Sequence, residues 1–502
     1  MPHLTPRFAP RLMPRLVVAL LGAGALWAAH AAQSNPPKGE AVFRAGADRT
    51  DITPELGILI VGNFNPGPAT HVHDPLYART LVLDDGTTRL AFVVCDNVGI
   101  PKLVCDEAKR IISGKTGLPK SHVVISSTHT HSAGTARENT LTPAEEVRDG
   151  FMGDLPPLSS YQQFLARRIA DSVRNAVQRL EPAKIGWGSG SDATHVFNRR
   201  WYVKSEANRR NPFGGVDTVR MNPPVGNTEE LIKPAGPIDP EISFISVQTK
   251  SGRPLALLAN YSLHYVGGIP NGAISGDYFG VFDRRIGELL VADRSVPGFV
   301  GIMTNGTSGD INNVNFRQRG VAMAPYEKMN RVGNAVAAEV YRAYQAIQHR
   351  EWVKLDARYE ELPLAPRRPT AEMVAYAKQV LAKPAGGKPW HGNEVSYSKN
   401  VLRAANAPAE MRAPIQTFRI GDLAVAATPV ETLVEVGLEI KSKTPFPDAF
   451  TISIANGAFG YMPTVEQHKL GGYETWLGTN RVEHEAAPRM VKRLLGMMQE
   501  MR

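Results

Sequence analysis

The sequence has few cysteines, no long apolar run beyond its start, and no strong excess of one charge. Cys95 and Cys105 are the only cysteines among 502 residues, too few for a fold built on a disulfide framework. Neither belongs to a Cys-x-x-Cys pair or lies near a histidine in the sequence, which argues against thiol catalysis. Lys and Arg number 57 against 48 acids. Because the basic residues are dispersed, we expect no nucleic-acid partner.

The first residues have the features of an export signal. Three arginines precede an apolar run at 16–29, and Ala-His-Ala at its end fits the small-x-small cleavage pattern. A run of about fourteen residues is shorter than the roughly twenty that a membrane-spanning helix needs. We therefore predict a signal peptide over residues 1–31, a periplasmic or secreted protein without a transmembrane span, and one domain over residues 32–502. An uncleaved anchor is the alternative.

Short apolar runs alternate with helical spacing along the rest of the chain, a pattern typical of α/β folds. The clearest helix covers residues 161–180, where apolar residues recur every three or four positions. Nothing marks a linker, so we predict a mixed sheet in a single large domain. The other expected elements are strands at 80–83, 90–95, 123–127, 255–261, 300–304, 415–420, 423–427 and 451–454, and helices at 329–347, 370–381, 431–440 and 488–498.

Two stretches, residues 198–240 and 383–397, are rich in Pro, Gly and Asn and have little periodicity. We expect both to be irregular. Loops of this length inside a compact domain are commonly binding loops or lids.

Two histidines follow the apolar run that ends at Ser127. His129 and His131 are two positions apart, so on an extended backbone both imidazoles point to the same side. Such a pair suits two metal ligands, or one ligand and one acid–base group. A pair of surface histidines is the alternative.

Other polar candidates also follow apolar runs. His264 is a third imidazole, with a buried, carbonyl-bonded histidine as the alternative. Asp310, in Gly-Asp-Ile-Asn-Asn, is placed to orient a histidine or to form a plain turn. Glu431 is expected to open a helix, where an acid is favourable in any case. Tyr461 by itself indicates ordinary packing.

Together these segments resemble the catalytic domain of the neutral, non-lysosomal ceramidases, over about residues 44–480. Several motifs in one order make the resemblance specific. They are Thr-His-Thr-His-Ser within residues 127–134, Asn-Tyr-Ser-Leu-His ending at His264, Gly309-Asp310, Pro-Val-Glu-Thr at 429–432, the segment from Asn456 to Tyr461, and Tyr473-Glu474.

The resemblance implies a zinc ion, Zn²⁺, held by His129, His264, Glu431 and Tyr461, with His131 positioned to pass a proton. Two imidazoles and a carboxylate also form a reasonable catalytic zinc set on chemical grounds. The implied reaction is hydrolysis of an amide, ceramide-like or another N-acyl bond, by attack of zinc-bound water. Tyr461 and Asn312 would stabilise the oxyanion.

The chain also departs from the family pattern. Asn312 stands where the family has a serine regarded as catalytic, and an amide can donate to an oxyanion but cannot act as a nucleophile. The family's C-terminal β-sandwich domain is not expected after the catalytic domain. We therefore expect weak activity on ceramide itself. The alternatives are an ester, lactone or sugar-derived polymer cleaved by hydrolysis or elimination, and a non-catalytic binding protein on the same scaffold.

Two further residues are expected to border the cleft. His73, in a second His-x-His, is a substrate-side candidate or part of a structural turn. Arg199, in a segment resembling the family's Asn-Arg-Ser, would receive an acidic group of the substrate or lie in a solvated loop. The expected partner is a small-molecule, lipid or oligosaccharide substrate.

Overall fold

The computed structural model describes residues 41–62, 66–136, 158–295, 298–383 and 388–502. The chain from Pro36 onward forms one compact unit. The predicted signal peptide lies outside the described residues. Among the helices that are described, none is both long and apolar enough to cross a membrane.

An eight-stranded sheet forms the centre of the fold, in the order β16-β14-β13-β8-β1-β5-β6-β7. The β6–β7 and β14–β16 pairs are parallel and the other neighbours are antiparallel, so the sheet is mixed. Most of its strands are apolar on both faces, as expected for strands covered on two sides. The strands are β1 (Arg44–Asp51), β5 (Tyr77–Asp84), β6 (Arg89–Cys95), β7 (Val123–Ser127), β8 (Glu181–Ser191), β13 (Glu241–Thr249), β14 (Pro254–Tyr261) and β16 (Val300–Asn305).

A second sheet packs against one face of the first. Its order is β18-β19-β20-β22, and a buried apolar cluster joins the two sheets. The rings of Phe92 in β6 and Phe418 in β19 lie 4.8 Å apart within that cluster. The four strands are β18 (Leu355–Leu364), β19 (Met411–Ile420), β20 (Leu423–Ala427) and β22 (Asp448–Ile452).

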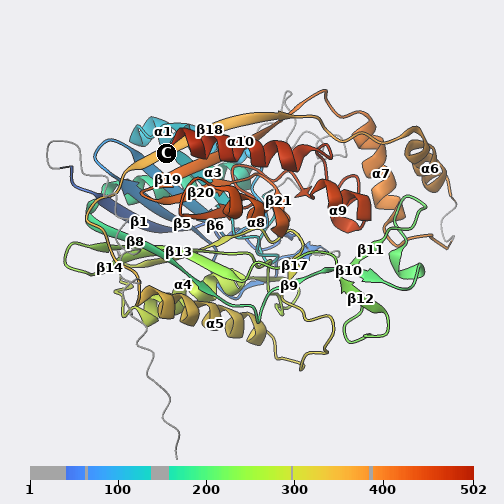
Figure 1. Ribbon diagram of the computed structural model, residues 1–502, viewed down its shortest axis with the longest axis horizontal. Helices are drawn as coiled ribbons and strands as arrows, with labels where there is room; N and C mark the ends of the chain where they lie inside the picture. The colour runs from blue at the N-terminus through green and yellow to red at the C-terminus, as the bar shows by residue number, and fades with distance from the viewer. Residues whose placement is uncertain (1–40, 63–65, 137–157, 296–297, 384–387) are drawn as a thin grey trace, which may run out of the picture. The chain divides into compact units, whose positions relative to one another are not determined.

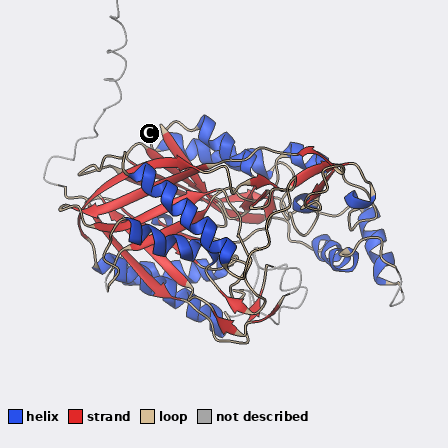
Figure 2. Cartoon of the chain, turned by 90° about the horizontal axis from the view of Figure 1, so that it is seen from below, coloured by secondary structure: helices blue, strands red, loops and turns tan. Residues whose placement is uncertain are grey.

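Helices cover the outer faces of both sheets and complete an αββα sandwich (Figure 1; Figure 2 shows helices lying across the strands). On the eight-stranded sheet, α1 and α3 share one apolar cluster with β5, β6 and β7, and α4 and α5 share another with β13, β14 and β16. On the second sheet, α8 and α10 share an apolar cluster with β18, β19 and β20. These helices are α1 (Lys102–Thr116), α3 (Ser160–Gln178), α4 (Asp277–Leu289), α5 (Glu327–Tyr344), α8 (Val434–Lys443) and α10 (Ala486–Glu500).

The helix expected at residues 161–180 illustrates how local sequence forms these elements. Ser159 and Gln162 make a reciprocal capping box at the start of α3, which satisfies backbone donors that a helix start leaves open. Leu165, Ile169 and Val173 then follow at helical spacing and are all fully buried. The apolar stripe therefore sets which face of α3 meets the sheet.

The edge strands β7 and β16 meet at their carboxyl ends, although they lie at opposite ends of the strand order. Asn305 donates from Nδ2 to the Thr128 carbonyl over 3.3 Å. The segment after β22 closes the junction, because Ser453 N donates to Asn305 O over 3.0 Å and Asn456 N donates to Ile125 O over 2.6 Å. The sheet therefore curls, and the segments that follow β7, β14, β16 and β22 converge on one place.

Several expectations about local structure are wrong. Residues 198–240 are not irregular throughout, because they contain a small sheet of β11 (Val219–Met221), β10 (Arg200–Val203) and β12 (Leu231–Pro234). Glu431 does not open a helix. It lies in β21 (Glu431–Thr432), its N–H donates to Gly460 O over 2.9 Å, and α8 begins at Val434. Because the backbone of β21 pairs with β23 (Tyr461–Met462), its hydrogen-bonding groups are not available to a helix.

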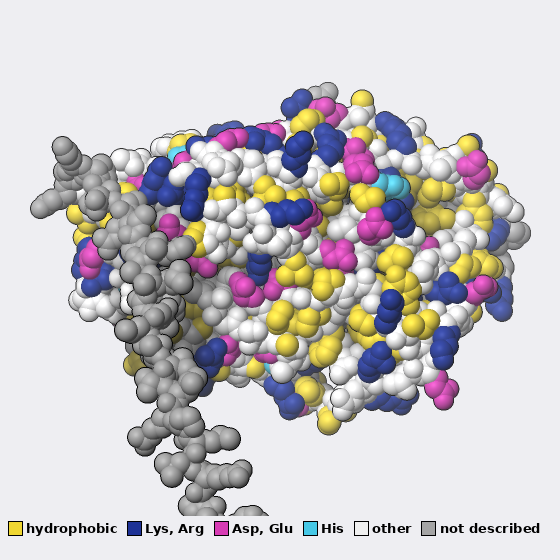
Figure 3. Space-filling view, viewed as in Figure 1, with side chains coloured by type: hydrophobic (Ala, Val, Ile, Leu, Met, Phe, Trp, Pro, Cys, Tyr) yellow, Lys and Arg dark blue, Asp and Glu magenta, His cyan; other side chains and the backbone are white. Residues whose placement is uncertain are grey.

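The remaining helices and strands are short. Helix α7 begins inside the stretch at 383–397 that was expected to be irregular. On the face drawn in Figure 3, Lys and Arg side chains are interspersed with Asp and Glu. The shorter elements are β2 (Leu59–Ile60), β3 (Gly67–Pro68), β4 (His71–Val72), β9 (Phe197–Asn198), β10 (Arg200–Val203), β11 (Val219–Met221), β12 (Leu231–Pro234), β15 (Ala273–Ile274), β17 (Ile311–Asn312), α6 (Ala371–Leu381), α7 (Glu394–Ala405), α9 (Val465–Leu470), η1 (Lys120–His122), η2 (Ala207–Arg209) and η3 (Tyr473–Thr475).

Candidate metal centre

Three histidines bring their ring nitrogens together where the edge strands meet. His129 Nε2 lies 3.0 Å from His264 Nε2 and 3.3 Å from His131 Nε2. All three residues are buried, and their ligand atoms lie within 4.8 Å of one another. This arrangement of nitrogen donors can hold a metal ion.

A carboxylate and a phenol lie beside the imidazoles. Glu431 Oε2 is 3.3 Å from His129 Nε2 and 3.9 Å from His264 Nε2, and it is a buried oxygen without a hydrogen-bond partner. Tyr461 pairs with Glu431 across β21 and β23. In a tetrahedral site with bonds of about 2.0–2.1 Å, neighbouring ligand atoms lie about 3.3–3.4 Å apart. The observed spacings, and the unpartnered oxygen, fit a zinc ion.

Backbone carbonyls orient two of the rings. Nδ1 of His129 lies 2.6 Å from Val98 O, and Nδ1 of His264 lies 3.0 Å from Ser308 O. Because a carbonyl can only accept, each Nδ1 carries the proton and each Nε2 presents its lone pair to the cluster. Burial, reinforced by the neighbouring His129, holds the pKa values of His131 and His264 well below their usual range. These two rings are therefore neutral, the form that binds metal.

The backbone at His129 is not the extended one that the sequence spacing suggested. Strand β7 ends at Ser127, and His129 has φ 72°, in the left-handed region that non-glycine residues rarely adopt. Its N–H donates to Asn97 O over 2.9 Å. The two imidazoles meet through this turn and not through strand alternation, and strained positions of this kind cluster at functional sites.

His131 is held between two neighbours. Its ring stacks on Tyr265 with centroids 3.7 Å apart and 15° between the planes. On the other side, a Cβ added at Gly62 would lie 2.7 Å from His131 Cγ, and Gly62 has φ 109°. Only glycine fits this close approach without strain.

Arg199 is engaged inside the protein. Its Nε donates to Glu474 Oε1 over 2.9 Å, and its Nη2 donates to the Tyr461 hydroxyl over 3.0 Å. Arg200 donates to the second oxygen of Glu474 over 2.6 Å. Arg199 thus holds the Tyr461 hydroxyl beside the candidate metal ligands. Burial raises the pKa of Tyr461 well above its usual range despite this cation, so the hydroxyl keeps its proton.

Asp310 and Asn312 lie on the Gly-Asp loop, and their contacts are with the scaffold. Asp310 accepts from Val434 N over 2.9 Å and from Asn198 Nδ2 over 2.8 Å, so it ties the start of α8 to β9. Burial raises its pKa to about 6. Asn312 donates from Nδ2 to Asn222 Oδ1 over 3.0 Å. Of this loop, the carbonyl of Ser308 is the group that orients His264.

His73 is exposed, and its ring stacks on Tyr326 with centroids 3.6 Å apart. The structure therefore brings together His129, His131, His264, Glu431 and Tyr461, with Arg199 behind them. His73, Asp310 and Asn312 are not among the described residues that line the cavity at this centre.

That cavity has a volume of about 580 Å³ and opens onto His129, His131 and Glu431. Its apolar lining residues include Leu59, Val61, Val98, Ile454 and Ala458. Nothing in the sequence indicated that the segment before residue 63 would contribute. Part of the polar lining comes from α7 and the residue before it, within and just beyond the stretch at 383–397 whose composition suggested a binding loop. Its residues include Asn393, Ser396, Tyr397 and Asn400.

The match to known proteins agrees with this geometry. The family model for the N-terminal part of neutral/alkaline non-lysosomal ceramidases matches residues 43–320. This chain belongs to that ceramidase family. The matched region contains all three histidines of the cluster, whereas Glu431 and Tyr461 lie beyond it and reach the site through the fold.

Ceramidases also appear among the solved structures that share the fold. The neutral ceramidase from Pseudomonas aeruginosa is 18% identical, with a TM-score of 0.66 over 92% of this chain and 75% of that chain. A ceramidase complexed with C2 matches with the same identity and TM-score, over 92% of this chain and 76% of that one. At this identity the likeness concerns the fold, and it confirms the mixed α/β architecture expected from the sequence.

Proposed function

We propose that this ceramidase-family protein is an exported zinc-dependent hydrolase that cleaves an amide bond in a ceramide-like or other N-acyl compound. The main support is the spacing of the imidazole nitrogens and of the unpartnered Glu431 oxygen at the floor of a cavity. Nitrogen and carboxylate donors at tetrahedral spacing suit zinc better than calcium or magnesium, which prefer oxygen. In this proposal His129, His264 and Glu431 hold the ion, and Tyr461 is the adjoining fourth group.

The bound ion would supply Lewis-acid polarisation of a carbonyl group and of water. The protein's own groups would do the rest. Arg199 donates to the Tyr461 oxygen, and the raised pKa keeps the proton on that oxygen, where it meets the Glu431 carboxylate. In this proposal, once Glu431 is engaged with the ion, that O–H donates to the oxyanion that develops on the substrate carbonyl.

His131 is the proton carrier in this proposal. It is neutral because its pKa is lowered, so it can accept a proton from the attacking water and return it to the leaving nitrogen. Stacking on Tyr265 holds the ring in place. The alternative is that His131 Nε2, 3.3 Å from His129 Nε2, is itself a metal ligand.

Metal content and activity, measured on the same variants, separate these roles. His264→Ala and Glu431→Gln should lose stoichiometric zinc by elemental analysis, together with nearly all activity. His131→Ala should keep the zinc and lose about 10²–10⁴-fold in kcat, the usual contribution of general acid–base catalysis. Loss of zinc in His131→Ala would instead make His131 a ligand.

His122→Ala is the matched control, since the His122 Nδ1 also bonds to a backbone carbonyl, 3.1 Å away, but the residue does not line the cavity. It should retain both zinc and activity. A wild-type protein that takes up no transition metal when supplied with it would refute the proposal.

The bond that is cleaved can be identified by mass spectrometry of the products. An N-acyl amide should give a free carboxylic acid and an amine with one added water. The same panel should contain ester, lactone and uronate-containing oligosaccharide substrates. An unsaturated product without added water would indicate elimination and would contradict the hydrolytic part of the proposal.

A further inference from the structure

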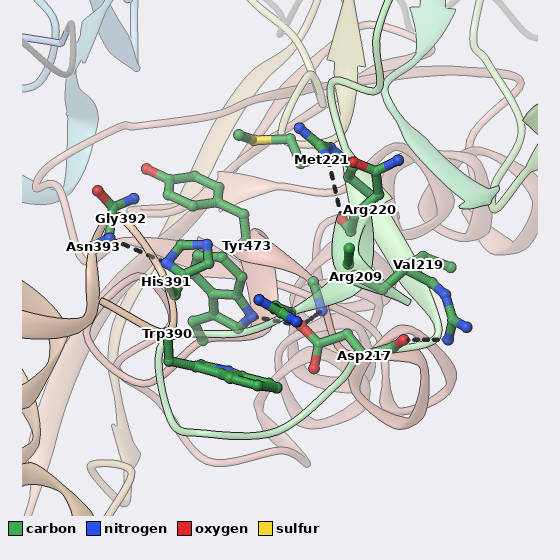
Figure 4. A pocket seen from close by; sticks show the side chains of 15 residues that line it. Arg209, Asp217, Val219, Arg220, Met221, Trp390, His391, Gly392, Asn393 and Tyr473 are labelled. Atoms are coloured by element: carbon green, nitrogen blue, oxygen red, sulfur yellow. Dashed lines mark hydrogen bonds between the residues drawn. The ribbon is translucent and has the colours of Figure 1, made fainter. Parts of the chain in front are cut away.

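A second cavity adjoins the first and is rich in arginine. Its volume is about 380 Å³, and Figure 4 shows Arg209, Arg220, Trp390 and His391 around it. Arg210 also lines this cavity, and Asn393 and Tyr473 line both cavities. The two cavities are therefore neighbours, with these two side chains common to both linings.

The arginines of this cavity have few partners within the protein. Arg209 Nη1 donates to the Asp217 carbonyl and Arg220 Nη1 donates to Asn208, whereas each guanidinium has five N–H donors. Within the part of the chain that the structure describes, no carboxylate forms an ion pair with Arg209, Arg210 or Arg220. Three guanidinium groups thus line one cavity without a direct ion pair, and Glu230 acts on Arg220 only from a longer distance.

One carboxylate, that of Asp217, is also among the residues that line this cavity. Asp217 Oδ2 accepts from Trp476 Nε1 over 2.7 Å and from Gly472 N over 2.9 Å, and Oδ1 accepts from Asn211 Nδ2 over 2.9 Å. These hydrogen bonds fix the loop around Trp476, and the Asp217 charge offsets only one of the three guanidinium charges in the lining.

Aromatic faces accompany the charges. The Arg210 guanidinium lies over the Trp390 ring at 4.2 Å, and His391 meets Trp476 edge-on at 5.2 Å. Trp390 Nε1 and Arg209 Nε are buried donors without a hydrogen-bond partner. Such donors are costly to leave unsatisfied unless a ligand or water uses them.

A line of aromatic rings joins this cavity to the metal centre. Tyr461 contacts Tyr473 at 5.7 Å between ring centroids, and Tyr473 contacts Trp476 at 5.8 Å. Tyr473 therefore lies between Tyr461, the proposed oxyanion donor, and Trp476 in the arginine cavity. Arg199, the residue expected from the sequence to receive an acidic group, is occupied by Glu474 and Tyr461.

We propose that the arginine cavity binds an oxyanion group, a carboxylate, sulfate or phosphate, carried by the substrate beyond the bond that is cleaved. Guanidinium forks match such groups in shape and charge, and the Trp390 and Trp476 rings can pack against the part of the substrate that carries the anion. The statement that the substrate carries this anion rests on the proposed function, but binding of the anion itself requires no catalysis.

Calorimetry on the purified protein tests the binding directly. The probes are glucuronate, inorganic sulfate and inorganic phosphate, with glucose as the uncharged comparison. At least one anion should bind, glucose should not, and the affinity should fall as salt is added. The ranking of the three anions identifies which oxyanion the cavity prefers.

Variants locate the binding in the cavity. Because a hydrogen bond to a charged group is worth about a factor of ten or more in affinity, Arg210→Gln with Arg220→Gln should weaken the preferred anion by at least about tenfold. Arg210→Lys, which keeps the charge but not the fork, should fall between the wild type and the double variant. Arg350→Gln is the control, since Arg350 stacks on Trp187 at a similar 4.3 Å but lines neither cavity.

Unchanged anion affinity in the double variant, with an unchanged unfolding midpoint, would overturn the inference. A kinetic comparison gives the second readout. For two N-acyl amides that differ only by a distal carboxylate, the double variant should raise the KM of the acidic compound relative to the neutral one. Hydrolysis without anion binding would refute the inference alone, and anion binding without hydrolysis of any amide would refute the proposed function alone.

Discussion

Glu474 offers the sharpest test of how the metal centre is supported. Its side chain is fully buried and receives Arg199 on one oxygen and Arg200 on the other, over 2.9 and 2.6 Å. Glu474→Gln keeps the shape and removes the charge. The amide can accept from one arginine, but its NH₂ group would face the donors of the other.

The expected loss of stability follows from this burial. The side chain of Arg200 is also 0% exposed and that of Arg199 only 6%, so neither cation can recover water when its counter-charge is removed. Breaking a buried ion pair on one side costs about 3–5 kcal/mol. We expect Glu474→Gln to lower the free energy of unfolding by an amount in that range.

Urea unfolding followed by tryptophan fluorescence and by circular dichroism measures this change. The two probes must give the same transition for a single free energy to be meaningful. Glu466→Gln is the matched control, because the Glu466–Lys469 pair is equally short at 2.6 Å but 76% and 64% exposed. An exposed pair contributes about 0–1 kcal/mol. If Glu474→Gln costs no more than the control, the buried network does not support the site as argued.

Further predictions concern pH, the Gly-Asp loop and backbone packing. The metal-free protein should lose stability as the pH falls below about 6.5, by about 1.4 kcal/mol per pH unit for each of His131 and His264. Their folded pKa values are lowered, so the unfolded chain binds the protons, and His264→Gln should reduce the slope in urea unfolding between pH 7 and 5. Asn312→Ala should change kcat by less than about threefold, as for a surface substitution of about 0.5 kcal/mol; a loss of about 10²-fold or more would instead make its amide an oxyanion donor. Gly309→Ala should cost about 1–3 kcal/mol in unfolding free energy and weaken zinc binding, because the new Cβ would lie 2.7 Å from Glu431 O. Gly114→Ala is the control: its Cβ would meet open space, so this variant should lose neither stability nor zinc affinity.

Some strands were predicted closely, although β1, β8, β13 and β18 were not predicted at all. The apolar, β-branched runs at 123–127 and 423–427 are observed as β7 and β20 with the same bounds, because these strands are buried on both faces and carry a strong local signal. Helix α1, by contrast, was not predicted. It begins after Pro101 without a side-chain cap and has no acidic residue in its first turn, so two of the usual signals for a helix start are missing.

The metal centre was only partly accessible from the sequence. The spacing of His129 and His131 is local, and it indicated a pair of neighbouring imidazoles even though the backbone between them is not extended. The contacts of Arg199 are different, since Glu474 lies 275 positions away. No local pattern distinguishes an arginine that faces substrate from one that meets a distant carboxylate. The arginines of the second cavity, Arg209, Arg210 and Arg220, lie in the stretch at 198–240, which the sequence distinguished only by its composition.

The convergence of chain segments explains how the chemistry and the specificity of this site can vary independently. His129 and His264 follow strands of the curled sheet, and backbone hydrogen bonds from Ser453 and Asn456 lock its two edges together. The proposed metal ligands are therefore fixed by the core of the sandwich. The arginine cavity is built by segments outside that core, around residues 207–221 and 390–393, and by the turn at Trp476. Because surface segments tolerate change better than buried strands, the proposed anion site can change without any change in the strands that carry the proposed metal ligands. An arginine-lined cavity beside the proposed metal centre is the arrangement expected for an acidic substrate under both proposals.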